Sequence, residues 1–143
     1  YGAVIGVFLK QKLSNHPLTI VGSGKQKRDF LYISDVCEAF FKAAISKYKN
    51  EIFNLGRGYA ESVNYLSSLI SDNKKFIPWR PGEPFKTEAN INKIKRYLKW
   101  KPKISLKNGI KEVIKNIRYW EKAPLWTPKK IKLATKEWIK YLK

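Results

Sequence analysis

Two arginines and one glutamate combine residue type and setting in a way that suits chemistry. Arg28 follows a glycine-rich turn, and Arg80 opens a loop that two prolines stiffen. Only five of the 30 basic residues are arginine, and an arginine in a rigid loop favours planar, two-pronged contacts with phosphate. Glu83 follows on the same loop, where its carboxylate could accept hydrogen bonds from ribose hydroxyls. These residues predict a phosphate site; the alternatives are surface ion pairs for the arginines and a pair with Lys86 for Glu83.

Other patterns with known chemistry are weaker. Tyr97 and Lys101 have the Tyr-x-x-x-Lys spacing of a helical acid/base pair, but Pro102 disfavours helix at Lys101, which favours a chance match. Neither residues 22–24 nor residues 56–58 continue to the third glycine of a dinucleotide-binding loop. We therefore expect both glycine pairs to form ordinary turns.

The chain has one cysteine, Cys37, and one histidine, His16. A lone cysteine excludes a disulfide within the chain and a cysteine-based zinc site. A lone histidine excludes multi-histidine metal sites and leaves no obvious general base. We expect no metal site and no catalytic residue in this sequence, and no stretch approaches the roughly 20 apolar residues that span a membrane.

Composition and charge bound the class of protein. The 143 residues are 43% hydrophobic and 14% aromatic, which is enough to bury a core in one domain or in a piece of a larger one. The formal charge is +19, and residues 93–143 hold 17 basic and three acidic residues of the total. This charge leaves open a nucleic-acid-binding module and a tail at a membrane surface. A lysine-rich solvated surface is the simpler interpretation.

The beginning of the chain indicates a longer protein. The sequence starts at Tyr1 and contains no methionine. Residues 1–9 are apolar and basic residues come after them, which is the reverse of a secretion signal. We expect the chain to start inside a helix of a longer protein, with a small complete domain that has lost its methionine as the alternative.

The order of the predicted elements indicates an α/β protein that finishes in helices. Short β-branched or aromatic runs before turns predict strands or extended segments at residues 18–21, 30–33, 52–55 and 76–79. Apolar residues three and four positions apart predict helices. The expected helices are one capped by Ser34 or Asp35 with apolar positions between 36 and 44, one at 63–70, one at 93–98 capped by Asn92, one capped by Ser105, and one that begins at Thr127 with Ile131, Ala134, Trp138, Ile139 and Leu142 on one face.

Several segments together resemble a known family. Residues 21–36 are similar to the GxGxxxRDFxYVxDV segment of extended short-chain dehydrogenase/reductase enzymes, the NAD-dependent nucleotide-sugar epimerases and dehydratases. Residues 52–56 look like the FN(V/L)G strand of that family, and residues 80–102 look like its RPGEPxxTxAxxxKxxxxLGWKP stretch. Residues 105–110 resemble the SxxxGI that follows. The match runs in order from the start to about residue 120, and UDP-sugar 4-epimerases are the members it resembles most.

The resemblance implies a Rossmann-type α/β fold and a division of the chain. Residues 1–122 would form the nucleotide-sugar-binding C-terminal part, and residues 123–143 an amphipathic helical tail without a catalytic role. The substrate would be a nucleotide sugar such as UDP-glucose. By resemblance, Arg28 and Arg80 would grip the diphosphate, Glu83 would bind the ribose hydroxyls, and Thr19, Ile20 and Val21 would lie along the base.

The resemblance also implies what lies outside this sequence. The family's N-terminal half carries the glycine-rich loop that binds NAD, a catalytic Ser/Thr and the Tyr-x-x-x-Lys pair. Hydride transfer to and from NAD at the sugar C4 would belong to that half, and 4,6-dehydration and decarboxylation stay open as reactions. The parent would be a cytoplasmic homodimer. One departure is Lys99, which stands where the family commonly has the glycine that ends a helix, and we expect that lysine cannot serve as that C-cap.

Overall fold

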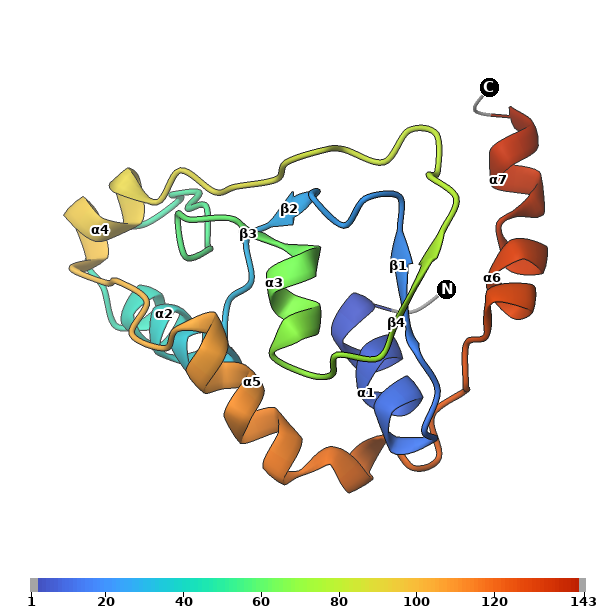
Figure 1. Ribbon diagram of the computed structural model, residues 1–143. Coiled ribbons are helices and arrows are strands. Elements are labelled where there is room, and N and C mark those ends of the chain that lie inside the picture. Colours follow the sequence, from blue (N-terminus) through green and yellow to red (C-terminus); the bar gives the residue numbers. More distant parts are fainter. Residues whose placement is uncertain (1–2, 142–143) are drawn as a thin grey trace.

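The computed structural model describes residues 3–141, and they form an α/β structure with helices at the C-terminal end (Figure 1). Strands β1 and β4 pair in parallel with Leu18 opposite Lys74, and strands β2 and β3 pair antiparallel with Arg28 opposite Glu61. The elements are α1 (Val4–Leu13), β1 (Leu18–Val21), β2 (Lys27–Arg28), α2 (Ile33–Ala44), β3 (Glu61–Ser62), α3 (Val63–Ser68), β4 (Lys74–Ile77), α4 (Asn92–Leu98), α5 (Leu106–Lys115), the 3-10 turn η1 (Ile117–Trp120), α6 (Pro128–Ala134) and α7 (Lys136–Tyr141).

Two hydrophobic clusters hold these elements together. The larger cluster surrounds β1, where Leu18 and Ile20 are completely buried between α1, α3 and α5. The smaller one surrounds Trp100, which packs with residues of α2 and α4. Trp100 is completely buried and its indole Nε1 donates to the carbonyl oxygen of Asp35 at 3.1 Å, so its polar atom is satisfied.

Two aspartates, one directly after β2 and one in the first turn of α2, hold neighbouring loops by hydrogen bonds. Asp29 accepts hydrogen bonds from the backbone N–H groups of Arg57, Gly58 and Ala89 at 2.7, 3.1 and 3.1 Å. Asp35 in the same way accepts from two consecutive N–H groups, at residues 103 and 104. In a chain with only 11 acidic residues, these two carboxylates serve the architecture.

Several local predictions from the sequence are confirmed. The strand at Leu18–Val21 has the expected bounds. The helix that ends at Leu98 is also present, but it begins at Asn92 after Ile91, so the prediction of Asn92 as its N-cap is wrong. The Ser105 and Thr127 side chains cap α5 and α6 by accepting from the N–H groups of Asn108 and Lys130. The expectation that Lys99 could not take the place of the glycine C-cap is wrong, because Lys99 follows α4 in the left-handed region with φ of 49°, a conformation that glycine adopts at lower cost.

Two predicted strands are absent from the described residues. Residues 30–32 and 52–55 have irregular backbone, residue 33 already belongs to α2, and β2 and β3 are short strands elsewhere. Phe30 packs against the larger cluster while Leu31 and Leu55 pack against the smaller one, so these residues are apolar because they fill cores and not because they belong to a ladder. Helix α2 begins at Ile33 after Tyr32, so the predicted caps Ser34 and Asp35 are wrong, and the Asp35 carboxylate accepts from another loop instead.

The C-terminal helix predicted as one segment is two. The break is at Thr135, whose hydroxyl donates to the carbonyl oxygen of Ile131 at 2.9 Å. Thr135 and Ile131 are buried, whereas Ala134 is exposed, so the buried face is shifted from the predicted one. Leu142, which was also predicted on this face, lies outside the described residues.

Helix α2 presents large apolar side chains on an exposed face. Phe40, Phe41 and Ile45 are each about two thirds exposed.

None of the helices within residues 3–141 is long and apolar enough to cross a membrane.

Candidate functional site

A pocket of about 280 Å³ lies between α1, β1, the start of α3 and the loop after β4. Apolar side chains of α1 and α3 form one part of its wall, and the polar part comes from three separate segments. The lining residues are Val4, Val7, Phe8, Thr19, Val21, Gln26, Arg28, Val63, Arg80 and Glu83. The chain therefore brings both arginines and the glutamate that the sequence singled out to one pocket.

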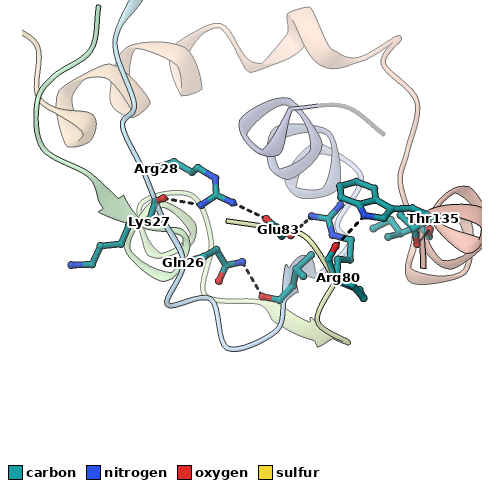
Figure 2. A network of polar contacts seen from close by, with 10 residues as sticks. Gln26, Lys27, Arg28, Arg80, Glu83 and Thr135 are labelled. Atoms are coloured by element: carbon teal, nitrogen blue, oxygen red, sulfur yellow. Dashed lines mark hydrogen bonds and ion pairs between the residues drawn. The ribbon is translucent and has the colours of Figure 1, made fainter. Parts of the chain in front are cut away.

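Arg28 and Arg80 meet on the carboxylate of Glu83 (Figure 2). Nη2 of Arg28 is 3.0 Å from Oε1 of Glu83, and Nη2 of Arg80 is 3.0 Å from Oε2. The three side chains are only 14–23% exposed, so solvent screens this network less than it screens a surface pair. Because the two arginines pair with a single carboxylate, this part of the pocket wall has a net positive charge, which favours binding of an anion.

The alternatives named for these residues are partly realised. Both arginines do form ion pairs, although these pairs are mostly buried. Glu83 does not pair with Lys86, because Lys86 pairs with Glu88 at 3.0 Å.

Strand-like pairing fixes Arg28 and the Arg80 loop relative to each other. The N–H of Lys27 donates to the carbonyl of Phe85 at 2.7 Å, and the N–H of Thr87 donates back to Lys27 at 3.2 Å. On the other side, β2 pairs with β3, so the backbone at Arg28 is held from two directions. Asp29 then fastens the next residue to two further loops. The guanidinium of Arg28 thus projects from a fixed backbone.

The three residues predicted to lie along the base do not all face the pocket, because successive side chains of β1 point to opposite sides of the strand. Thr19 and Val21 line the pocket, whereas the side chain of Ile20 points into the larger core and is completely buried. Thr19 is held by Gln11, which accepts from its N–H at 3.1 Å and donates to its hydroxyl at 2.8 Å. Ile20 is therefore not part of the pocket lining.

Gln26 is a pocket residue that the sequence did not single out. It is 2% exposed, and its Nε2 donates to the carbonyl of Val21 at 3.0 Å (Figure 2). Its Oε1 is buried without a hydrogen-bond partner among the described residues, which makes it an acceptor available to a ligand. A single glutamine between two lysines matches no motif with known chemistry, so nothing in the sequence indicates that Gln26 lies in a pocket.

The glycine pairs and the Tyr-x-x-x-Lys spacing do not form cofactor or catalytic sites. Gly22 and Gly24 have φ of 57° and 68° in a turn that leads to the short strand β2, not to the helix N-terminus that a dinucleotide pyrophosphate requires. A Cβ at Gly24 would meet Asn64 at 2.0 Å, so that glycine is needed for packing. Tyr97 lies on α4, which ends before Lys101, and it packs against Tyr48. Residues 3–141 thus do not fit NAD, and no group of three His, Cys, Asp or Glu in that range could hold a metal ion.

Comparison with known proteins places the chain in a family. Residues 1–56 match the model of the NAD dependent epimerase/dehydratase family. A Methanocaldococcus jannaschii protein named as a UDP-glucose 4-epimerase is 39% identical over 117 residues, which are 78% of this chain and 37% of that relative. This chain is part of a protein of the NAD-dependent epimerase/dehydratase family. UDP-glucuronic acid decarboxylase 2 of Arabidopsis thaliana is 32% identical over 82% of this chain and 27% of its own length.

Solved epimerase structures share the fold. The UDP-glucose 4-epimerase of Thermotoga maritima with UDP-glucose superposes with a TM-score of 0.75 at 31% identity, over 83% of this chain and 41% of that one. The UDP-glucuronic acid 4-epimerase of Bacillus cereus, in complex with UDP-glucuronic acid and NAD, gives 0.75 at 32% identity, over 82% and 40%. The chain therefore spans about two fifths of these enzymes. The epimerase/dehydratase resemblance is confirmed, and the comparisons give the nucleic-acid alternative no support.

Proposed function

We propose that this chain is the substrate-binding part of an NAD-dependent enzyme that acts on a UDP-sugar, with 4-epimerisation as the reaction. The observation that carries the proposal is the meeting of Arg28 and Arg80 at one pocket. Arg28 and Glu83 are 55 residues apart in the sequence, yet the network joins them beside β1. The named epimerase relatives supply the substrate class.

The electrostatics of the pocket suit a diphosphate. A diphosphate ester carries negative charge on several oxygens, and each guanidinium offers parallel N–H donors to such oxygens. Glu83 neutralises only part of the two arginine charges, so an arriving diphosphate meets a net positive wall. Because both arginines are held before binding, little ordering is left to oppose association.

Glu83 can serve the ribose while it stays paired with the arginines. A carboxylate has about four lone-pair sites, and the two ion pairs of Glu83 use one oxygen each. A ribose hydroxyl can therefore donate to either oxygen without displacing an arginine. In this arrangement the uracil lies along the backbone of Thr19 to Val21, where the buried acceptor Oε1 of Gln26 is also close to β1.

The redox chemistry belongs to residues outside this chain. NAD supplies the hydride acceptor and donor when bound, and we propose that a part of the protein absent from this sequence binds it. The substrate-binding part holds the nucleotide, and binding energy from the nucleotide positions the sugar for reaction. The cytoplasmic location, the homodimer and the division at residue 122 stay predictions.

The proposal is tested by titrating UDP into the full-length protein by isothermal calorimetry. Each arginine makes charge-assisted contacts, so Arg28→Ala and Arg80→Ala should each weaken UDP binding by about ten- to hundredfold. Two exposed positions provide matched controls, Arg118→Ala for the residue type and Lys111→Ala for the charge, and both should change the affinity by less than about twofold.

Equal losses at all four positions would mean generic electrostatic attraction and would contradict the proposal. A second titration with duplex DNA separates the alternative. Binding of DNA that persists at about 200 mM salt, where counterion-driven affinity collapses, would favour a nucleic-acid-binding module.

A further inference from the structure

The tail helices α6 and α7 lie against the segment that carries Arg80. Figure 1 shows them beside β4, at the opposite end of the molecule from α2 and α4. Gln11 of α1 fastens the chain before them by donating to the carbonyl of Trp126 at 2.7 Å. Ile131 and Thr135 are buried and line a groove with Ile77 and Arg80. The tail helices α6 and α7 therefore pack against the loop that contains Arg80.

Trp138 of α7 contacts two consecutive residues of that loop. Its indole Nε1 donates to the carbonyl oxygen of Pro81 at 3.0 Å, and its ring lies 5.5 Å from the guanidinium carbon of Arg80. The first contact fixes the backbone of the loop. The second is a cation–π contact, which arginine and tryptophan form more favourably than other pairs.

The Arg80 guanidinium is thus restrained by two different elements. Glu83, on the same loop, holds it through Nη2, as Figure 2 shows. Trp138, on the tail, holds it through the aromatic ring. Arginine has a long side chain whose ordering costs free energy on binding, and these two contacts order it in advance.

We propose that Trp138 is a positioning residue for the diphosphate and that the tail helices are a working part of the nucleotide site. This inference rests on the proposed function, because Arg80 is the residue through which Trp138 acts. Trp138 itself touches neither the pocket nor the reacting atoms. It orders the Arg80 side chain, so the conformational entropy of that side chain is lost during folding and not during binding.

The test measures UDP and uridine binding to the full-length protein. Trp138→Ala should weaken UDP binding by about three- to tenfold, which is the size of one cation–π contact or one ordered side chain. The same substitution should leave the dissociation constant of uridine, followed by ligand-observed NMR titration, within about twofold, because uridine has no phosphate for Arg80 to hold. The ratio of the two constants separates positioning from general damage to the fold.

Two variants complete the design. Tyr141→Ala removes an exposed aromatic residue from the same helix and should change neither constant. Trp138→Phe keeps an aromatic face but loses the donor to Pro81, so we expect it to recover part of the UDP affinity. If the Trp138→Ala variant does not fold, Trp138→Phe can take its place in both titrations. In an Arg80→Ala background, Trp138→Ala should have no further effect, since contacting residues are non-additive.

The outcomes separate this inference from the proposed function. If the unsubstituted protein does not bind UDP, both are overturned. If Arg80→Ala weakens UDP binding while Trp138→Ala binds as tightly as the unsubstituted protein, only the role of the tail is overturned. Equal loss of UDP and uridine in Trp138→Ala would show a structural residue and would also overturn it.

Discussion

Asp29 offers a quantitative test of how the Arg28 segment is held. Its carboxylate accepts three backbone N–H groups, from Arg57 at 2.7 Å on Oδ1 and from Gly58 and Ala89 at 3.1 Å on Oδ2. An asparagine at this position has one acceptor oxygen, so Asp29→Asn keeps at most two of the three bonds and turns an amide N–H₂ toward the remaining donor. Gly56 leaves room for this carboxylate, because a Cβ at that position would lie 2.4 Å from Oδ2.

The magnitude follows from these contacts. A hydrogen bond to a charged group contributes about 1.5–3 kcal/mol, and the two retained bonds lose their charge assistance. We expect Asp29→Asn to lower the free energy of unfolding by about 2–4 kcal/mol. The assay is urea denaturation of the full-length protein followed by tryptophan fluorescence, with the slope checked for constancy between variants.

Asp72→Asn is the matched control, because Asp72 is exposed and the substitution changes the net charge by the same amount. We expect it to change the free energy of unfolding by less than about 0.5 kcal/mol. Equal effects of the two substitutions would show that the change in net charge, not the three hydrogen bonds, governs the loss. That result would refute the account of how Arg28 is fixed.

Three further predictions concern the architecture around the site. Trp100→Phe leaves the carbonyl of Asp35 without its indole donor in a buried position, and thermal and urea unfolding should show a loss of about 1–3 kcal/mol. Lys99→Gly relieves a left-handed backbone position and should raise the free energy of unfolding by about 0.5–1 kcal/mol, contrary to the usual effect of glycine; no gain would contradict the C-cap assignment. The pKa of Glu88 is lowered, first by the hydrogen bond from Lys86 and then by that from the backbone at residue 60. A carboxyl group with a lowered pKa stabilises the folded state at pH values above its usual pKa, and this contribution is lost as the pH falls through the lowered pKa. Glu88→Gln removes the titrating group, so the free energy of unfolding should decline less steeply on acidification. An unchanged dependence of stability on pH would contradict this prediction.

Local signals in the sequence identified most of the helices and the strand at the pocket. Capping residues such as Ser105 and Thr127 act on the N–H groups of their own helix, so their effect can be read from neighbouring residues. The arginines were found because their loops are rigid and arginine is scarce. The confirmed resemblance then supplied the family, although the roles given to single residues stay predictions.

The parts that sequence reasoning missed depend on contacts between distant segments. Residues 30–33 look like a strand because they are apolar, but none of the strands within residues 3–141 pairs with them, and Phe30 and Leu31 instead fill two different clusters. The contact of Trp138 with the Arg80 loop joins residues 57 apart in sequence. No periodicity within α7 could indicate which loop it covers. The inward direction of Ile20 was accessible from strand alternation, since Thr19 and Val21 must share the other face.

A crystal structure of the full-length protein with bound UDP would locate the nucleotide relative to the two arginines. We expect diphosphate oxygens within about 3 Å of the guanidinium nitrogens of both Arg28 and Arg80. We also expect a ribose hydroxyl on Glu83 and the uracil along β1. A structure in which UDP lies elsewhere, with both arginines still engaged only by Glu83, would contradict the proposed function.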